Sequence, residues 1–214
     1  MAGAAGQNSD VFPHDRVVFF SDAVFAIAIT LLAIELKAPT EDAIARVGAA
    51  HALGELVPLF TAFVISFFVA AQFWASHLLT WKCVARVTGR LLWLGIGQLF
   101  FVVLMPFATA LYSESFRTQQ HLPLMFYCLV LTGVSLFGYL ARREVLRESS
   151  AMSADEKRWF EVRARVPLLV FAASIPLALV VPTWAGGLVF ILIFPATALA
   201  RRWTLRRPLP EPAL

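Results

Sequence analysis

The sequence predicts an all-α, polytopic membrane protein with six membrane-spanning helices. Of its 214 residues, 59% are hydrophobic and only 15% are charged, a composition that places the chain among bilayer-embedded proteins. Its apolar residues gather in long runs, and about 20 such residues are needed to cross the hydrocarbon core. Its positive charges fall mainly on alternate connections between those runs. The net charge of +4 is therefore a topology signal, and we expect no nucleic-acid partner.

The chain begins with a small, polar segment, residues 1–15, which we expect to be a disordered cytoplasmic N-terminus. The first span follows at about residues 17–36. We expect no removable signal peptide, because this apolar run is a full span with charged flanks. It nevertheless contains Ser21, Asp22 and Thr30. A carboxylate near hydrocarbon costs on the order of a few kcal/mol, so we expect this helix to carry the function and the other spans to house it.

Five further apolar runs complete the predicted transmembrane domain, residues 16–200. The first connection has room for a short amphipathic helix. The remaining spans are expected at about residues 53–79, 91–112, 122–140, 166–181 and 184–200. A charged stretch before the fifth span is expected to be a helical extension or amphipathic, and the chain closes with a cytoplasmic tail, residues 201–214. Prolines within spans are tolerable because neighbouring helices can satisfy the freed carbonyls.

Lysine and arginine residues set the predicted orientation. Of the 18 in the chain, only Lys37, Arg46 and Arg117 fall on one side of the predicted membrane. The others lie at the start of the first span, in the second and fourth connections, and in the tail. Because cytoplasmic loops carry the excess of positive charge, both termini are expected in the cytoplasm, with the chain in the plasma or inner membrane.

A helical projection of the first span, at about 100° per residue, separates an apolar stripe from a polar flank. The stripe consists of Ile27, Leu31 and Ile34. Thr30 lies at its edge, whereas Ser21 and Asp22 point well away. Periodicity alone leaves open whether the stripe faces lipid, a neighbouring helix or a pore. The polar flank needs partners inside the protein, because lipid offers none.

Three further ionisable residues lie within or beside the predicted spans. Arg16 stands at the boundary of the first span. Glu35, at its outer end, is an interfacial residue that reaches water or, if the helix lines a pore, a residue of the pore mouth that favours cations. His77 shares a helix face with Trp74 and is a structural residue, a proton carrier or a partner of Asp22. We favour the Asp22 network, since two isolated polar groups in one bundle have reason to meet.

The sequence contains no soluble catalytic motif and no familiar metal-binding motif. The two cysteines, Cys83 and Cys128, are too few and too far apart for a zinc site. We therefore predict no enzymatic activity, no cofactor and no bound metal. The T-V-G-Y-G filter of the familiar potassium channels is also absent. The residues alone leave a channel and a proton-coupled transporter using Asp22 and His77 equally open, with a non-transporting membrane scaffold as a further alternative.

One short pattern, R-x-x-x-F-S-D, resembles the signature of the transmembrane-protein-175 potassium-channel family. In this chain it is formed by Arg16, Phe20, Ser21 and Asp22. The end of the second span, with Trp74 and His77, is similar to that family as well, as is the plan of six spans with cytoplasmic ends. A single copy of the signature in six spans resembles the single-repeat prokaryotic members.

The resemblance implies a homotetramer in the bilayer, with the four first helices lining a central pore for potassium ions. It implies a hydrophobic constriction in place of a carbonyl filter, formed by Ile27, Leu31 and Ile34. It also implies a role in ion selectivity for Thr30. The signature residues would hold the first helix through hydrogen bonds to neighbouring spans, with Trp74 and His77 as partners. With the resemblance, the channel becomes the preferred function.

Overall fold

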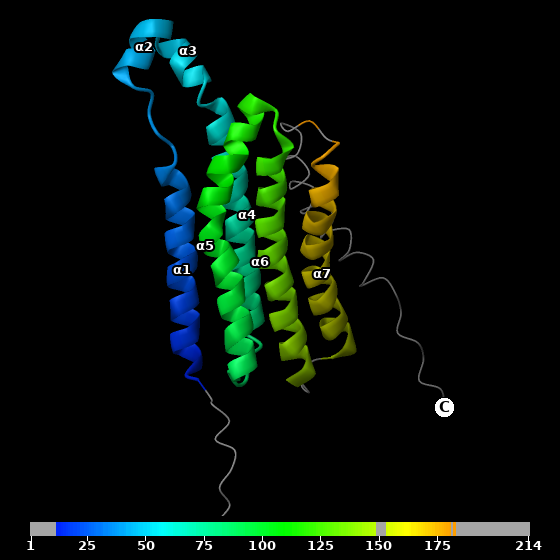
Figure 1. Ribbon diagram of the computed structural model, residues 1–214. Coiled ribbons are helices and arrows are strands. Elements are labelled where there is room, and N and C mark those ends of the chain that lie inside the picture. Colours follow the sequence, from blue (N-terminus) through cyan, green and yellow to red (C-terminus); the bar gives the residue numbers. More distant parts are fainter. Residues whose placement is uncertain (1–11, 149–152, 181, 183–214) are drawn as a thin grey trace, which may run out of the picture.

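The computed structural model describes residues 12–148, 153–180 and 182, most of which form a bundle of upright helices (Figure 1). In chain order the described helices are α1 (His14–Ile34), α2 (Glu41–Val47), α3 (Ala49–Gly54), α4 (Val57–Trp81), α5 (Gly89–Thr118), α6 (His121–Glu148) and α7 (Ala154–Leu177). α5 packs against α1, α4 and α6, and α6 packs against α7. The predicted all-α class is confirmed for the described residues. The predicted sixth span, residues 184–200, and the tail lie outside them.

The start of α1 is held against the connection between α4 and α5. Pro13, whose ring fixes its φ angle near the observed −61°, directly precedes the helix. The backbone N–H of Phe12 donates to the carbonyl of Val87 at 3.2 Å, which forms an isolated antiparallel bridge. The His14 Nε2 atom bonds to the carbonyl of Trp81 at 3.1 Å. These contacts tie the lower end of α1 in Figure 1 to the end of α4.

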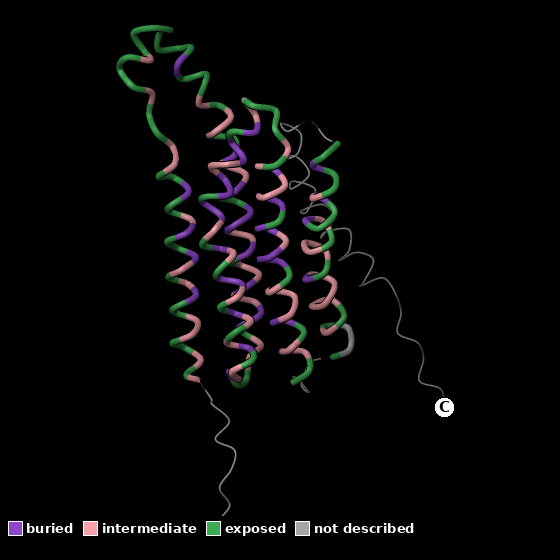
Figure 2. Tube along the Cα trace, viewed as in Figure 1, coloured by how far each residue is buried: buried purple, intermediate pink, exposed green. Residues whose placement is uncertain are grey.

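The connection after α1 holds the short helices α2 and α3, which project beyond the bundle at the top of Figure 1. Thr40 caps the N-terminus of α2: its side-chain oxygen accepts a hydrogen bond from the backbone N–H of Ala43, an ordinary N-cap. Gly48 separates α2 from α3 with a φ angle of +82°, a conformation that favours glycine. Most of this connection is exposed (Figure 2).

Glycines allow α5 and α6 to approach closely. A Cβ atom added to Gly133 on α6 would lie 2.4 Å from the Phe101 ring on α5. A Cβ atom on Gly97 of α5 would lie 2.3 Å from the Phe137 ring on α6. Each glycine therefore receives an aromatic ring from the facing helix, the arrangement by which small residues bring membrane helices together.

A chain of hydroxyl groups crosses the buried interior between α4, α5 and α6. Tyr127 Oη and Ser66 Oγ lie 2.9 Å apart, and Thr109 Oγ1 lies 2.8 Å from both Ser66 Oγ and the carbonyl of Met105. The apolar side chains around these hydroxyl groups form one buried cluster, to which α1, α4, α5, α6 and α7 contribute. Satisfied hydrogen bonds in such a low-dielectric interior make the packing of these helices specific.

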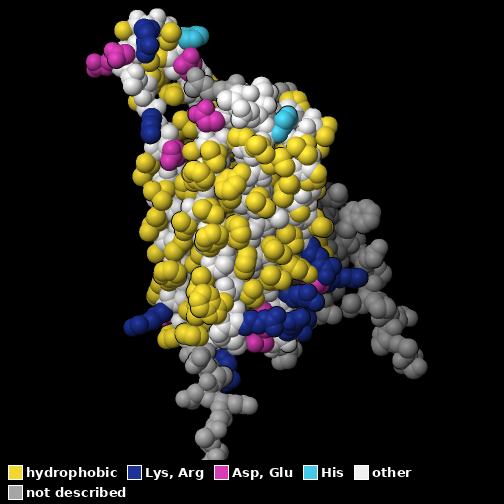
Figure 3. All heavy atoms as spheres, viewed as in Figure 1, with side chains coloured by type: hydrophobic (Ala, Val, Ile, Leu, Met, Phe, Trp, Pro, Cys, Tyr) yellow, Lys and Arg dark blue, Asp and Glu magenta, His cyan; other side chains and the backbone are white. Residues whose placement is uncertain are grey.

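Four of the described helical segments are long and apolar enough to cross a membrane: α1, α3 with α4, α5 and α6. They correspond to the first four predicted spans, so the chain is a multi-pass membrane protein. α7 is not among them because its first half is strongly charged. The predicted fifth span, residues 166–181, begins within its second half, and the count of six spans stays a prediction. Apolar side chains form a broad belt, and Lys and Arg gather at its lower rim (Figure 3).

Candidate functional site

The two faces of α1 have different surroundings. Ser21, Phe25, Ala28 and Leu32 are buried against the rest of the bundle. The opposite face carries the predicted apolar stripe, and its side chains are exposed: Ile27 by 58%, Leu31 by 37% and Ile34 by 66%. Figure 2 shows α1 at the edge of the bundle, with exposed positions recurring along its whole length. The bundle of one chain therefore holds α1 by one face and leaves the other uncovered.

Asp22 lies between these faces and bonds to α4. Its Oδ1 atom accepts a hydrogen bond of 2.9 Å from Nε1 of Trp74. Ser21 is buried, but its hydroxyl donates to the carbonyl of Val17 within the same helix at 2.9 Å. The expected bond from Ser21 to a neighbouring span is therefore replaced by a local one. A serine hydroxyl in a helix readily reaches the carbonyl four residues earlier.

His77 has a different partner from the one that the sequence suggested. Its Nδ1 atom lies 2.9 Å from Oε1 of Gln98 on α5. Its ring contacts the rings of Phe25 and Trp81 in a tilted arrangement. Among the described residues no hydrogen bond joins His77 to Asp22, and its Nε2 atom has no partner. The residues proposed for a proton relay thus lack a direct hydrogen bond between them.

The remaining predicted residues of α1 lie on its exposed side or at its ends. Arg16 and Phe20 are exposed in its first two turns, and Thr30 is exposed beside the apolar stripe. The Thr30 hydroxyl donates to the carbonyl of Ile27 at 2.8 Å, which leaves the lone pairs of its oxygen available as acceptors. Glu35 forms the C-terminal cap of α1 and is partly exposed.

Arg142 falls in the charged connection that the sequence predicts after the fourth span, yet it is buried inside the bundle. It lies on α6 and donates to Ser76 and Thr80 of α4. Spacing carried a signal for this position, because Arg142 follows Ser135 and Gly138 at helical intervals of seven and four residues. Gln98, the partner of His77, was also missed, although it is a lone amide within an apolar run.

Metal-binding groups do not gather anywhere in the described part of the chain: no three His, Cys, Asp or Glu side chains come together there. Cys83 and Cys128 are both free. The arrangement around α1 is instead one of an anchored face and an uncovered apolar face. In a membrane protein the uncovered face must meet lipid, another subunit or a pore.

Comparison with known proteins identifies proteins that are similar to this chain in sequence and in fold. Residues 16–106, which include α1, α4 and the first part of α5, match the family described as endosomal/lysosomal potassium channel TMEM175. That match contains most of the residues discussed for α1 and α4. It covers the first half of the described bundle rather than the whole chain.

Curated relatives are named potassium channels. The chain is 39% identical over 123 residues to one from Streptomyces collinus, with 56% of this chain and 59% of the relative covered. A second, from a Chryseobacterium species, is 34% identical over 105 residues, covering 49% and 52%. A third, from Chamaesiphon minutus, is 40% identical over 99 residues, covering 46% and 49%. The match thus spans about half of the length of these relatives.

Solved structures share the fold over more of the chain. A lysosomal potassium-selective channel TMEM175 homolog from Chamaesiphon minutus aligns with a TM-score of 0.76 and 26% identity, covering 87% of this chain and 97% of the other. The potassium channel MtTMEM175, solved as a variant with a nanobody fusion, aligns with a TM-score of 0.63 and 16% identity, covering 97% and 99%. This second likeness concerns the fold alone.

Proposed function

We propose that this chain, whose residues 16–106 match the TMEM175 family, is a subunit of a potassium channel in which α1 lines the pore. The observation that carries the proposal is the division of α1 into a face held by the bundle and an apolar face left uncovered. Four copies around an axis would bring the uncovered faces together. The names of the curated relatives supply the permeant ion.

The constriction is formed by Ile27, Leu31 and Ile34, which follow one another at intervals of four and three residues on the uncovered face. Such spacing stacks their side chains along one line of the helix. Rings of branched apolar side chains offer no hydrogen bonds to the shell of water around an ion. A narrow ring therefore excludes water and blocks the ion, and a slightly wider ring conducts.

Thr30 provides oxygen atoms beside the constriction. Its hydroxyl hydrogen is engaged by the carbonyl of Ile27, so the oxygen faces the uncovered side as an acceptor. A hydroxyl oxygen in this state stabilises a cation that has lost part of its water shell. Glu35, at the end of α1, adds a negative charge at the pore mouth, where it raises the local concentration of cations.

The other side of α1 anchors it. The Trp74–Asp22 hydrogen bond joins α1 to α4, and Phe25 and Leu32 insert into the shared apolar core. The proposed subunit has six spans in the plasma or inner membrane, with both termini in the cytoplasm. The gathering of Lys and Arg at the lower rim (Figure 3) supports this orientation.

Ion flux from liposomes tests the proposed function. The full chain is reconstituted into vesicles loaded with potassium, and passive efflux is followed by a fluorescent reporter of membrane potential, with sodium-loaded vesicles as the comparison. The proposal expects currents that follow the potassium gradient and need no proton gradient. Saturable flux that requires a pH difference would point to a coupled transporter. The absence of any flux from correctly assembled protein would refute the channel.

A further inference from the structure

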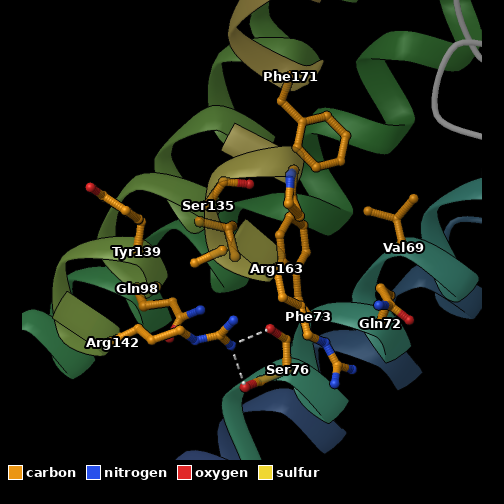
Figure 4. Close-up of a pocket in the computed structure, with 14 residues that line it drawn as sticks. Val69, Gln72, Phe73, Ser76, Gln98, Ser135, Tyr139, Arg142, Arg163 and Phe171 are labelled. Carbon is orange, nitrogen blue, oxygen red and sulfur yellow. Dashed lines mark hydrogen bonds between the residues drawn. The ribbon is translucent and has the colours of Figure 1, made fainter. Parts of the chain in front are cut away.

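A cleft between α4, α5, α6 and α7 lies apart from the uncovered face of α1. Its cavity volume is about 40 Å³. Its lining changes along its length. One part is apolar, with Val69, Phe73, Val134 and Phe171, and the other is polar and basic, with Ser76, Gln98, Arg142 and Arg163. Figure 4 shows the polar side chains of Arg142, Gln98 and Ser76 close together, with Phe171 and Val69 away from them.

Arg142 brings a positive charge into this cleft without a negative partner among the described residues. The residue is only 3% exposed. Its Nη2 atom donates to Ser76 Oγ at 2.7 Å and to Thr80 Oγ1 at 2.9 Å, and its Nε atom donates to Thr80 Oγ1 at 3.1 Å. All of these acceptors are neutral. Removing a guanidinium from water without a counter-charge is costly, so an anion bound here is strongly favoured.

The guanidinium retains hydrogen-bonding capacity for such an anion. Its Nη1 atom has one contact in the described structure, a long 3.5 Å bond to the carbonyl of Phe160, and a guanidinium nitrogen of this kind carries two N–H groups. The Phe160 ring lies 4.7 Å from the guanidinium carbon, which covers one face of the group. The edge of the guanidinium that bears Nη1 is therefore available to bind an anion.

Two further residues of the cleft point to the same ligand. Arg163 lines it from α7, so the cleft holds a second positive charge that an anion could share with Arg142. Ser135 is 5% exposed, lines the cleft from α6, and its hydroxyl has no hydrogen-bond partner among the described residues. A buried hydroxyl without a hydrogen-bond partner is unfavourable, so an oxygen atom of a ligand near Ser135 would be stabilising.

We propose that this cleft binds a phosphate group, with Arg142 and Arg163 as its cationic contacts. A guanidinium N–H group forms a strong, charge-assisted hydrogen bond to a phosphate oxygen. Arg142 lies beside the last two turns of α4, at the end of the bundle where Lys and Arg gather (Figure 3). Because Lys and Arg gather at the membrane surface, we assign this end of the bundle to the level of lipid headgroups. Basic pockets between membrane helices bind phosphate-bearing headgroups. The apolar side chains in the other part of the cleft are of the kind that contacts an acyl chain.

The test uses the delipidated full chain in detergent and measures bound ligand by native mass spectrometry. Phosphatidylglycerol is compared with a diacylglycerol of the same acyl chains, which lacks the phosphate. In a separate arm, inorganic phosphate is compared with chloride at equal ionic strength by thermal unfolding. Binding of phosphatidylglycerol but not diacylglycerol identifies a lipid as the source, and stabilisation by inorganic phosphate identifies the free ion. Either supports the site.

Variants decide whether the binding is at this cleft. Arg163→Gln and Arg142→Gln are expected to weaken phosphate binding at least about tenfold, the loss of one charge-assisted contact. Arg143→Gln is the matched control, because Arg143 is exposed on the same helix, and its binding should equal that of the wild type. If Arg142→Gln fails to fold, Arg163→Gln and Ser135→Ala carry the test. The proposal is overturned if the wild type binds neither form, or if Arg163→Gln binds as well as Arg143→Gln. No ion flux enters the measurement, so its outcome is independent of the channel.

Discussion

The indole Nε1 of Trp74 on α4 donates a 2.9 Å hydrogen bond to the carboxylate of Asp22 on α1. This bond joins two helices whose residues lie 52 positions apart in the chain. It places a negative charge from the first span on a defined donor, which lowers the cost of keeping that charge in a membrane helix. It also limits the rotation of α1, the helix on which the proposed constriction depends.

Removing the Asp22 carboxylate should therefore destabilise the assembled protein. We expect Asp22→Ala to reduce stability by about 1–2 kcal/mol, because a hydrogen bond to a charged group is lost and the Trp74 donor is left without its acceptor. Thermal unfolding in detergent and the yield of oligomer measure the effect.

A double-mutant cycle with Trp74→Phe isolates the bond itself. In the Trp74→Phe background, Asp22→Ala should cost less, with a coupling energy of about 1 kcal/mol. Ser21 provides the contrast, because its hydroxyl bonds within α1 and should show no coupling to Trp74. Strictly additive losses for Asp22 and Trp74 would contradict the role assigned to the bond.

Replacing side chains of the apolar stripe with smaller or polar ones should increase passive potassium leak. Leu31→Ala widens the proposed ring and Ile27→Asn gives water a hydrogen-bonding partner there, and each removes part of the barrier from dewetting. We expect efflux from liposomes to rise several-fold in each variant. Leu129→Ala is the matched control, because Leu129 is an exposed leucine on α6. Equal efflux from Leu31→Ala and Leu129→Ala would mean that the stripe does not line the pore.

The contact between α5 and α6 should be sensitive to one added methyl group. Gly133→Ala would place Cβ 2.4 Å from the Phe101 ring, so the ring or the helix must shift. We expect a loss of about 1–3 kcal/mol, as for other overpacked cores, measured by thermal unfolding. Gly89→Ala is the control, because nothing lies within 4 Å of a Cβ at that position. A Gly133→Ala protein as stable as Gly89→Ala would refute this account of the contact.

The beginning of α7 should become less stable in acid. The Glu156 carboxylate accepts hydrogen bonds from the backbone N–H of Ser153 at 2.9 Å and from its hydroxyl at 2.8 Å, and these bonds hold the pKa of Glu156 below its usual value. Its contribution is therefore complete above the ordinary range of a glutamate carboxyl, about pH 4. It is lost as the pH falls through the lowered pKa.

Hydrogen exchange measures this effect. We expect protection in the first turn of α7, corrected for intrinsic exchange rates, to fall on acidification in the wild type. Ser153→Ala should show low protection already at neutral pH and a weaker dependence on pH, because the N-cap is lost. Ser153→Thr keeps the hydroxyl and should resemble the wild type. If Ser153→Ala keeps the full pH dependence, Ser153 is not its source.

Local patterns in the sequence were sufficient for the four long apolar helices α1, α4, α5 and α6. The apolar runs predicted the first four spans, because the thickness of the bilayer sets how many consecutive apolar residues a span needs. Such runs can be found from the composition of the sequence alone. The projection of α1 placed Ile27 and Ser21 on different sides, and the structure has the first exposed and the second buried. A helix has a fixed angle per residue, so such a division needs no knowledge of neighbouring helices.

Partners across helices were beyond the same reasoning. His77 was assigned to a network with Asp22, but it bonds to Gln98, a residue 21 positions away on a different helix. Arg142 was counted as a topology charge, yet it is buried against Ser76 and Thr80. A sequence pattern shows which side of a helix is polar. The rotation and axial position of each neighbouring helix decide which polar group lies opposite that side.

The sequence by itself determined that this chain is helical, crosses a membrane several times and carries one unusually polar first span, because these properties depend on composition and on the period of a single helix. Only the tertiary structure decided which face of α1 the bundle leaves uncovered and which side chains close around Arg142. Those outcomes depend on close packing between helices distant in the chain, where the small size of Gly97 and Gly133 sets how near α5 and α6 can come.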